Sequence, residues 1–135
     1  MEVIKWTDEL SVGVGEMDRQ HQKLISMINT LILEQKTITD PKTIAELLTE
    51  MTDYAREHFH AEEFLLSEYG YQDLSQQVSQ HEGFITKTHD FIDSSEIGAN
   101  ILSKALLDFL KSWLVFHILE EDMKYKDFFH KKGVS

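Results

Sequence analysis

The sequence predicts an all-α protein, an up-down-up-down antiparallel four-helix bundle with a non-helical N-terminal arm. Three observations lead to this prediction. Apolar residues recur every three or four positions in four long segments, which is the pattern of amphipathic helices. The 135 residues include a single Pro, and the alternation typical of strands is scarce. Short polar segments separate the four amphipathic segments, and short connections place consecutive helices antiparallel.

Signals for the ends of helices agree with this pattern. The helices are expected at about residues 18–36, 41–69, 73–93 and 97–120, after an arm at residues 1–16 and before a short C-terminal tail. The second helix opens with Asp40, a good N-cap, followed by Pro41 at the first helical position. Gly70 is the expected C-terminal stop of that helix. We expect residues 1–135 to form one domain.

Composition excludes several classes of function. The chain has 13 Lys and Arg against 24 Asp and Glu, a net charge of −11. This charge argues against binding to nucleic acid or to anionic lipid. Cys is absent, which excludes disulfides and thiolate metal sites. The chain lacks a transmembrane run and a signal-peptide pattern, so we expect a cytoplasmic protein.

Each predicted helix has a polar interruption on its apolar face. A buried polar group without a partner costs about 1–3 kcal/mol, so four such interruptions mean either that the apolar faces are assigned wrongly or that the groups act together. The interruptions are His21 in the first helix, His58 and Glu62 in the second, Gln77 and His81 in the third, and His117 in the fourth.

A comparison of depths places the four histidines together. In an antiparallel hairpin, two residues at equal height lie symmetrically about the loop. The midpoints between successive histidines fall at positions 39–40, 69–70 and 99, each in or beside a predicted connection between helices. Imidazoles and carboxylates from facing helices make a transition-metal site, and a bundle core is a known place for one.

A second carboxylate could come from the end of the fourth helix. Glu62 already lies one turn from His58, and a bridging carboxylate suits two metal ions. Five residues turn a helix by about 500°, which places Asp122 about 140° away from the His117 face. Asp122 therefore requires the helix to end or distort near position 120. Glu121 fits an ideal helix more easily, so spacing alone does not decide which of these two residues supplies the second carboxylate.

Several motifs carry a resemblance to a known family. They are Trp6, Ser11-Val12-Gly13-Val14, Asp18-Arg19-Gln20-His21, His58-Phe59-His60-Ala61-Glu62, Tyr69-Gly70-Tyr71-Gln72-Asp73-Leu74 and Trp113 to His117 with Asp122. In order and spacing the chain resembles hemerythrin, specifically the single-domain bacterial hemerythrins. The resemblance covers about residues 4–125.

The resemblance implies a non-haem di-iron centre, with an oxo or hydroxo bridge between irons in the Fe²⁺ or Fe³⁺ state. His21 and His58 would ligate the iron that binds O2 at its open position. Glu62 and Asp122 would bridge the two irons, so the resemblance favours Asp122 over Glu121 as the second carboxylate.

The second iron departs from the family pattern. His81 and His117 would ligate it, but the third histidine of the family falls at position 77, which is Gln77. The amide could ligate weakly, could hydrogen-bond to a water that completes the shell, or could leave the second position loose and partly filled. An open second iron would favour autoxidation or reaction with peroxide or NO.

The first functional interpretation is a protein that binds O2 reversibly for transport, storage or sensing. The alternative is a di-iron or single-iron protein that reacts with peroxide or NO because of Gln77. An enzyme is less favoured, since no side chain stands out as a general acid or base. The expected partners are O2 and an oxygen-using enzyme or a reductant, and the chain is expected to be a monomer or weak oligomer. Leu24, Trp113 and Phe116 are expected to line an O2 pocket.

Overall fold

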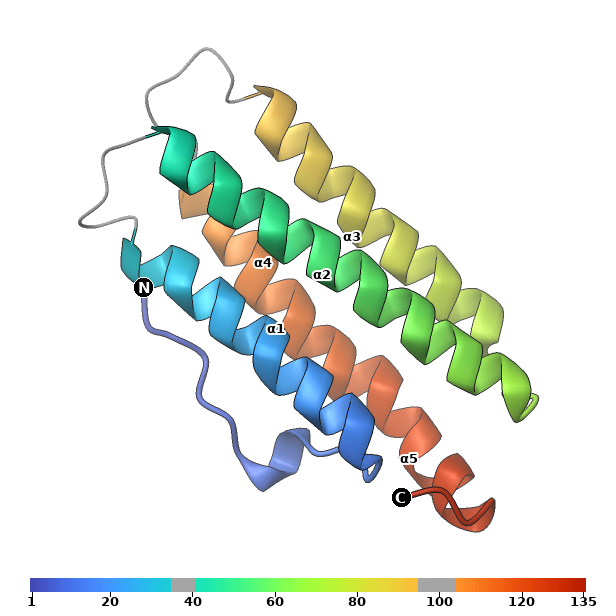
Figure 1. The fold of residues 1–135 in the computed structure, drawn as a ribbon. Coiled ribbons are helices and arrows are strands. Elements are labelled where there is room, and N and C mark those ends of the chain that lie inside the picture. The colour runs from blue at the N-terminus through green and yellow to red at the C-terminus, as the bar shows by residue number, and fades with distance from the viewer. Residues whose placement is uncertain (35–40, 95–103) are drawn as a thin grey trace.

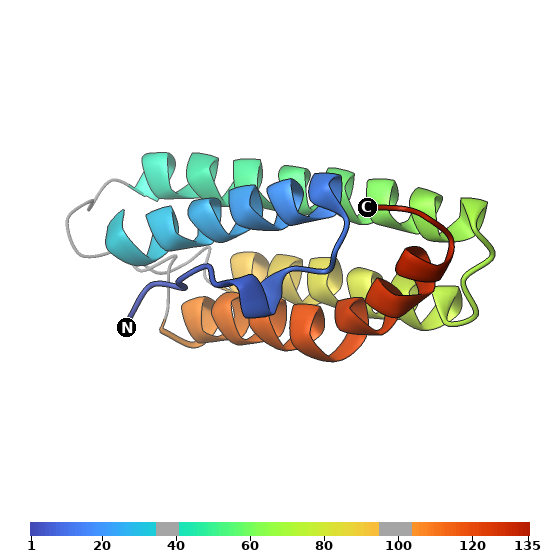
Figure 2. The ribbon, with the colours of Figure 1, turned by 90° about the horizontal axis from the view of Figure 1, so that it is seen from below.

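Four long helices form an antiparallel bundle in the computed structural model, which describes residues 1–34, 41–94 and 104–135 (Figure 1). Helix α1 packs against α2 and α4, and α3 packs against the same two helices. Figure 2 shows the pair α1 and α2 lying over the pair α3 and α4. The predicted all-α four-helix bundle is confirmed. The helices are α1 (Gly15–Glu34), α2 (Pro41–Glu68), α3 (Leu74–Ser94), α4 (Lys104–His117) and α5 (Met123–Lys131).

The N-terminal arm is fixed to the bundle by hydrogen bonds. Asp18 in the first turn of α1 accepts bonds from the Ser11 hydroxyl at 2.6 Å and from the Val12 amide at 2.8 Å. Farther along, the Asn29 side chain donates to the Ile4 carbonyl and accepts from the Ile4 amide, both at 2.8 Å. Because both ends of the arm are held, its apolar residues cover one edge of the core.

The turn between α2 and α3 follows the predicted stop signal. Gly70 has φ of +70°, a conformation that costs glycine little. The Gly70 amide bonds to the Ser67 carbonyl at 3.1 Å, and the Tyr71 amide bonds to the Leu66 carbonyl at 3.0 Å. This is the Schellman pattern of helix C-termini. The turn aligns α3 antiparallel to α2 and therefore sets the relative height of their inward side chains.

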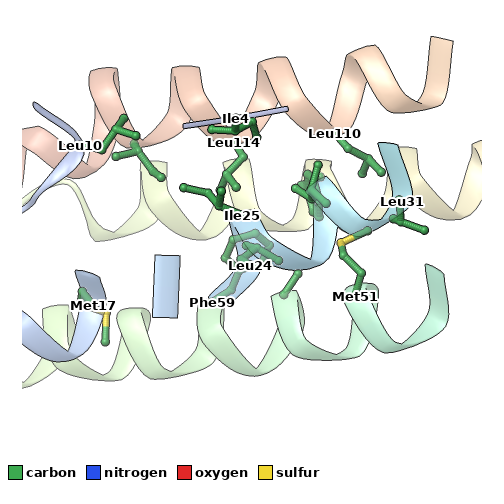
Figure 3. Close-up of a cluster of buried hydrophobic side chains, with 14 of the residues drawn as sticks. Ile4, Leu10, Met17, Leu24, Ile25, Leu31, Met51, Phe59, Leu110 and Leu114 are labelled. Atoms are coloured by element: carbon green, nitrogen blue, oxygen red, sulfur yellow. The ribbon is translucent and has the colours of Figure 1, made fainter. Parts of the chain in front are cut away.

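The core is a continuous apolar cluster along the bundle axis, and Figure 3 shows part of it. Helix α1 contributes the stripe expected from its periodicity, including Leu24, Ile28 and Ile32, all fully buried. In the described ranges, none of the helices is both long enough and apolar enough to cross a lipid bilayer.

The C-terminal part differs from the prediction. Helical structure does not stop near residue 120: a π-helical turn at Ile118–Asp122 follows α4 and leads into α5. The short tail is therefore a helix of nine residues. The expected limits at residues 36 and 97, and the cap at position 40, lie outside the described residues.

Candidate metal centre

Four imidazoles and two carboxylates meet in the interior, with at least one side chain from each of the four long helices. All six are between 0% and 2% exposed, so water does not supply their hydrogen bonds. These side chains are His21 on α1, His58 and Glu62 on α2, His81 on α3, His117 at the end of α4, and Asp122 at the end of the π-helical turn.

The two oxygens of Glu62 face different histidines. Its Oε2 atom lies 3.3 Å from His21 Nε2 and 3.7 Å from His58 Nε2. Its Oε1 atom lies 3.1 Å from His81 Nε2. The undistorted helix α2 places Glu62 one turn after His58, so the pair shares one face. The carboxylate therefore stands between two groups of imidazoles.

Asp122 has the same arrangement from the opposite side. Its Oδ2 atom lies 3.2 Å from His21 Nε2, and its Oδ1 atom lies 3.2 Å from His117 Nε2. The π-helical turn supplies the distortion that a spacing of five residues requires, because π turns close i→i+5 hydrogen bonds. Glu121, the other acidic residue considered, instead lies 3.2 Å from Lys124 Nζ.

The donor atoms fit a metal ion. In two groups, His21–His58–Glu62 and Glu62–His81–His117, the potential ligand atoms all lie within 4.8 Å of one another. Both ring nitrogens of His21, Glu62 Oε1 and Asp122 Oδ2 are buried and lack a hydrogen-bond partner among the described residues. The approaches of 3.1–3.3 Å between these atoms therefore bring charges together without forming proper hydrogen bonds. A cation between them would compensate the cost of their burial.

Three of the four histidines are oriented by a second set of polar residues. In each, Nδ1 bonds to an oxygen on a neighbouring helix. Because these oxygens accept, Nδ1 carries the proton and the Nε2 lone pair faces the interior, as in many metal-bound histidines. The bonds are His58 to Gln20 Oε1, His81 to Glu63 Oε2 and His117 to Gln80 Oε1, each 2.7 Å long.

The sequence interpretation missed these three orienting residues, although a signal was present. Each is the immediate chain neighbour of a predicted site residue and is half-buried. Gln20 precedes His21, Glu63 follows Glu62, and Gln80 precedes His81. A polar residue beside an inward-facing one points toward the adjacent helix, where it can reach that helix's histidine.

Two more side chains contact the carboxylates. Gln77 Nε2 donates to Asp122 Oδ1 at 3.0 Å, and the Tyr125 hydroxyl donates to Glu62 Oε2 at 2.8 Å. Tyr125 is fully buried on α5. It lies in the segment predicted as a tail, and no pattern in the sequence indicated that it reaches the centre.

Aromatic rings cover two of the histidines. Phe59 stacks on His81 with ring centroids 4.0 Å apart, and Trp113 stacks on His117 at 4.4 Å.

Leu24, one of the residues expected to line an O2 pocket, is fully buried one turn after His21. The expectation for Phe116 is wrong, because its side chain is 68% exposed. Apolar residues lie on several sides of α4, so the pattern did not specify which of them face inward.

The metal-free electrostatics differ between the two histidines nearest Glu62 Oε2. Burial lowers the pKa of His21, but the carboxylates of Asp122 and Glu62 beside its Nε2 atom outweigh this effect and raise the pKa to about 10. Burial dominates at His58 and lowers its pKa to about 4. The pKa of Glu62 is held well below its usual range, because the surrounding histidines outweigh the effect of burial. In the metal-free protein, the two carboxylates therefore favour the protonated form of His21, whereas burial favours the neutral form of His58.

A helical bundle with buried imidazoles and carboxylates facing one another from all four helices defines a metal-binding bundle protein. A family model described as the hemerythrin HHE cation binding domain matches residues 12–129. The chain belongs to the hemerythrin family.

Individual relatives agree with this assignment. A bacteriohemerythrin of Stenotrophomonas maltophilia is 33% identical over 127 residues, which cover 94% of this chain and 82% of the relative. A bacteriohemerythrin of Clostridium acetobutylicum is 31% identical, covering 90% and 98% of the two chains. The crystal structure of a wild-type hemerythrin is 27% identical and superposes with a TM-score of 0.85, covering 93% of this chain and 97% of that one.

Proposed function

We propose that this chain is a non-haem di-iron protein that binds O2 reversibly, for transport, storage or sensing. The observation that carries the proposal is the arrangement of Glu62 and Asp122. Each carboxylate directs one oxygen toward His21 and its other oxygen toward His81 or His117. Bridging carboxylates between two sets of imidazoles suit a pair of transition-metal ions. Proteins of the hemerythrin family bind iron and O2, which supports the same function here.

The residues divide into two metal positions. The first would be held by His21, His58, Glu62 Oε2 and Asp122 Oδ2. The second would be held by the remaining two histidines with Glu62 Oε1 and Asp122 Oδ1. When bound, iron supplies the one-electron redox chemistry that O2 binding needs. The four imidazoles are neutral ligands, so the two carboxylates carry the negative charge of the centre.

The rest of the chain orients the ligands and keeps water away. Gln20, Glu63 and Gln80 hold the imidazole rings by their outer nitrogens, so the inner nitrogens remain free to ligate. The ring of Phe59 covers His81, and the ring of Trp113 covers His117. A dry interior strengthens the electrostatic interactions inside it and slows side reactions with water.

Optical spectroscopy of the iron-loaded, reduced protein tests this function. We expect a visible absorption band that appears when O2 is added and disappears when O2 is removed, over repeated cycles. A band that never forms, or that forms once and is not reversed by deoxygenation, would contradict reversible binding.

The second candidate function is reaction with peroxide or NO. The observation that favours it is Gln77, which contacts Asp122 through its amide nitrogen at a position where the family pattern has a histidine. Stopped-flow spectra after addition of O2, peroxide or NO separate the two functions. Sustained turnover of peroxide or NO with a reductant would favour the second, and a stable, reversible O2 adduct would favour the first. The cytoplasmic location, the client and the oligomeric state stay predictions.

A further inference from the structure

Gln77 lies inside the centre, where it offers an amide in place of the imidazole of the family pattern. It is fully buried on α3, one turn before His81 and on the same face. Its Nε2 atom donates to Asp122 Oδ1 at 3.0 Å. A carboxylate oxygen only accepts hydrogen bonds, so the amide nitrogen must face Asp122. The amide nitrogen is therefore directed at Asp122, one of the two carboxylates that would bridge the metal ions. The amide oxygen, Oε1, is buried and has no hydrogen-bond partner among the described residues.

No other histidine takes the place of a third imidazole. All seven histidines of the chain fall within the described residues. The three that lie outside the centre, His60, His89 and His130, are all exposed. The second metal position therefore has two imidazoles, as many as the first.

The carboxylates divide equally between the two positions as well. Glu62 directs Oε2 to the first position and Oε1 to the second, and Asp122 directs Oδ2 and Oδ1 in the same way. Each carboxylate also accepts one bond from a buried neutral donor, Tyr125 for Glu62 and Gln77 for Asp122. Gln77 thus has the same relation to one bridge as the tyrosine has to the other.

We propose that Gln77 is a positioning residue for Asp122, and that the two metal positions have equivalent sets of two imidazoles and two carboxylate oxygens. With four protein donors each, both positions retain room for a small exogenous anion. This inference rests on the proposed di-iron function and deepens it, since a centre of this kind binds external ligands at two ions instead of one.

Azide binding to the ferric protein measures the number of open positions. After loading, iron per chain is determined first, and azide is then titrated while the azide-to-iron absorption band is followed. We expect two azides per chain that carries two irons. One azide per two irons would overturn the inference and leave the proposed function intact. Fewer than two irons per chain would overturn both.

Variants at position 77 separate a positioning role from ligation. Gln77→His supplies the third imidazole, so we expect the azide count to fall from two to one. Gln77→Leu removes the bond to Asp122, and we expect two azides still, with iron affinity lowered about 10–100-fold. Gln76→His, at an exposed neighbouring position, is the matched control and should retain two azides.

Two results from these variants would contradict the inference. An azide count that rises above the wild-type value in Gln77→Leu would show that the amide oxygen had been a ligand. An unchanged iron affinity in Gln77→Leu would show that the bond to Asp122 does not position it. Circular dichroism identifies a variant that fails to fold, and the wild-type azide count then decides alone.

Discussion

Helix α2 and the segment from α4 to α5 each bring one imidazole and one carboxylate to the centre, but through different helix geometry. On α2, His58 and Glu62 are four residues apart on a regular helix. On the other segment, His117 and Asp122 are five apart, and the π-helical turn at Ile118–Asp122 absorbs the extra residue. Regular periodicity positions the first pair, whereas a local irregularity positions the second.

The difference shows where a helical pattern stops being informative. π-Helical turns are rare and frequently lie at functional sites, because they rotate a side chain that a regular helix would direct elsewhere. Here the turn brings Asp122 Oδ1 to 3.2 Å from His117 Nε2. The same turn continues the helix into α5 and so delivers Tyr125 to Glu62. One irregularity thus accounts for two contacts of the centre.

Single-residue deletions test this comparison with the largest expected effect. Deleting exposed His60 rotates Glu62 by about 100° relative to His58, so we expect iron binding to be lost. Deleting exposed Leu119 converts the π-helical turn into a regular one with Asp122 four residues after His117, so we expect two irons per chain to be retained. Iron analysis measures both.

The opposite pattern would contradict the account. If the Leu119 deletion abolished iron binding while helical content stayed unchanged, the π-helical turn would have a role beyond positioning Asp122. If the His60 deletion retained two irons, the regular spacing on α2 would not be what positions Glu62.

Removing the α2 carboxylate should have the next largest effect. Glu62→Ala leaves His21 and His81 facing a buried site without their shared carboxylate. We expect the metal-free protein to lose about 3–5 kcal/mol of unfolding free energy, because one partner of a buried charge pair is removed. Iron per chain should fall below one. Urea denaturation and iron analysis measure these effects, with exposed Glu57→Ala on the same helix as a control that changes neither.

Periodicity and stop signals were enough to predict the bundle and the residues on regular helices. The stripe of α1, the end of α2 at Gly70 and the common depth of the histidines all follow from chain spacing. The orientation of α4 could not be predicted from spacing, because its apolar residues lie on several sides and Phe116 is exposed. Tyr125 could not be placed either, since its position depends on a distortion that helical periodicity does not encode.

The orienting residues should have a smaller effect than the carboxylates. Gln80→Ala removes the bond at 2.7 Å that holds His117 Nδ1, so the ring at the end of α4 loses its fixed orientation. We expect iron affinity to fall about 10–100-fold without loss of the fold. Competition with a chelator measures this, and Gln76→Ala, exposed on the same helix, is the control. Equal affinities in the two variants would show that Gln80 does not orient the ligand.

The pH dependence of the metal-free protein separates the contributions of two of the histidines. The pKa of His21 is raised from 6.5 to about 10, so its stabilisation is fully present below pH 6.5 and is lost as pH rises toward 10. The pKa of His58 on α2 is lowered to about 4, so its contribution is present above pH 6.5 and lost as pH falls toward 4.

Urea denaturation at several pH values measures this difference. We expect the deficit of His21→Gln relative to wild type to shrink between pH 6.5 and 10, and the deficit of His58→Gln to shrink as pH falls from 6.5 to 4. A constant deficit at all pH values would show that neither histidine has a shifted pKa in the folded protein.

The iron content of the wild-type protein after anaerobic loading with Fe²⁺ shows whether the four histidines on four helices, with Glu62 and Asp122 between them, form a centre for two metal ions. We expect two irons per chain, removed together by a chelator and restored by reloading. One iron or none per folded chain would contradict a centre for two metal ions.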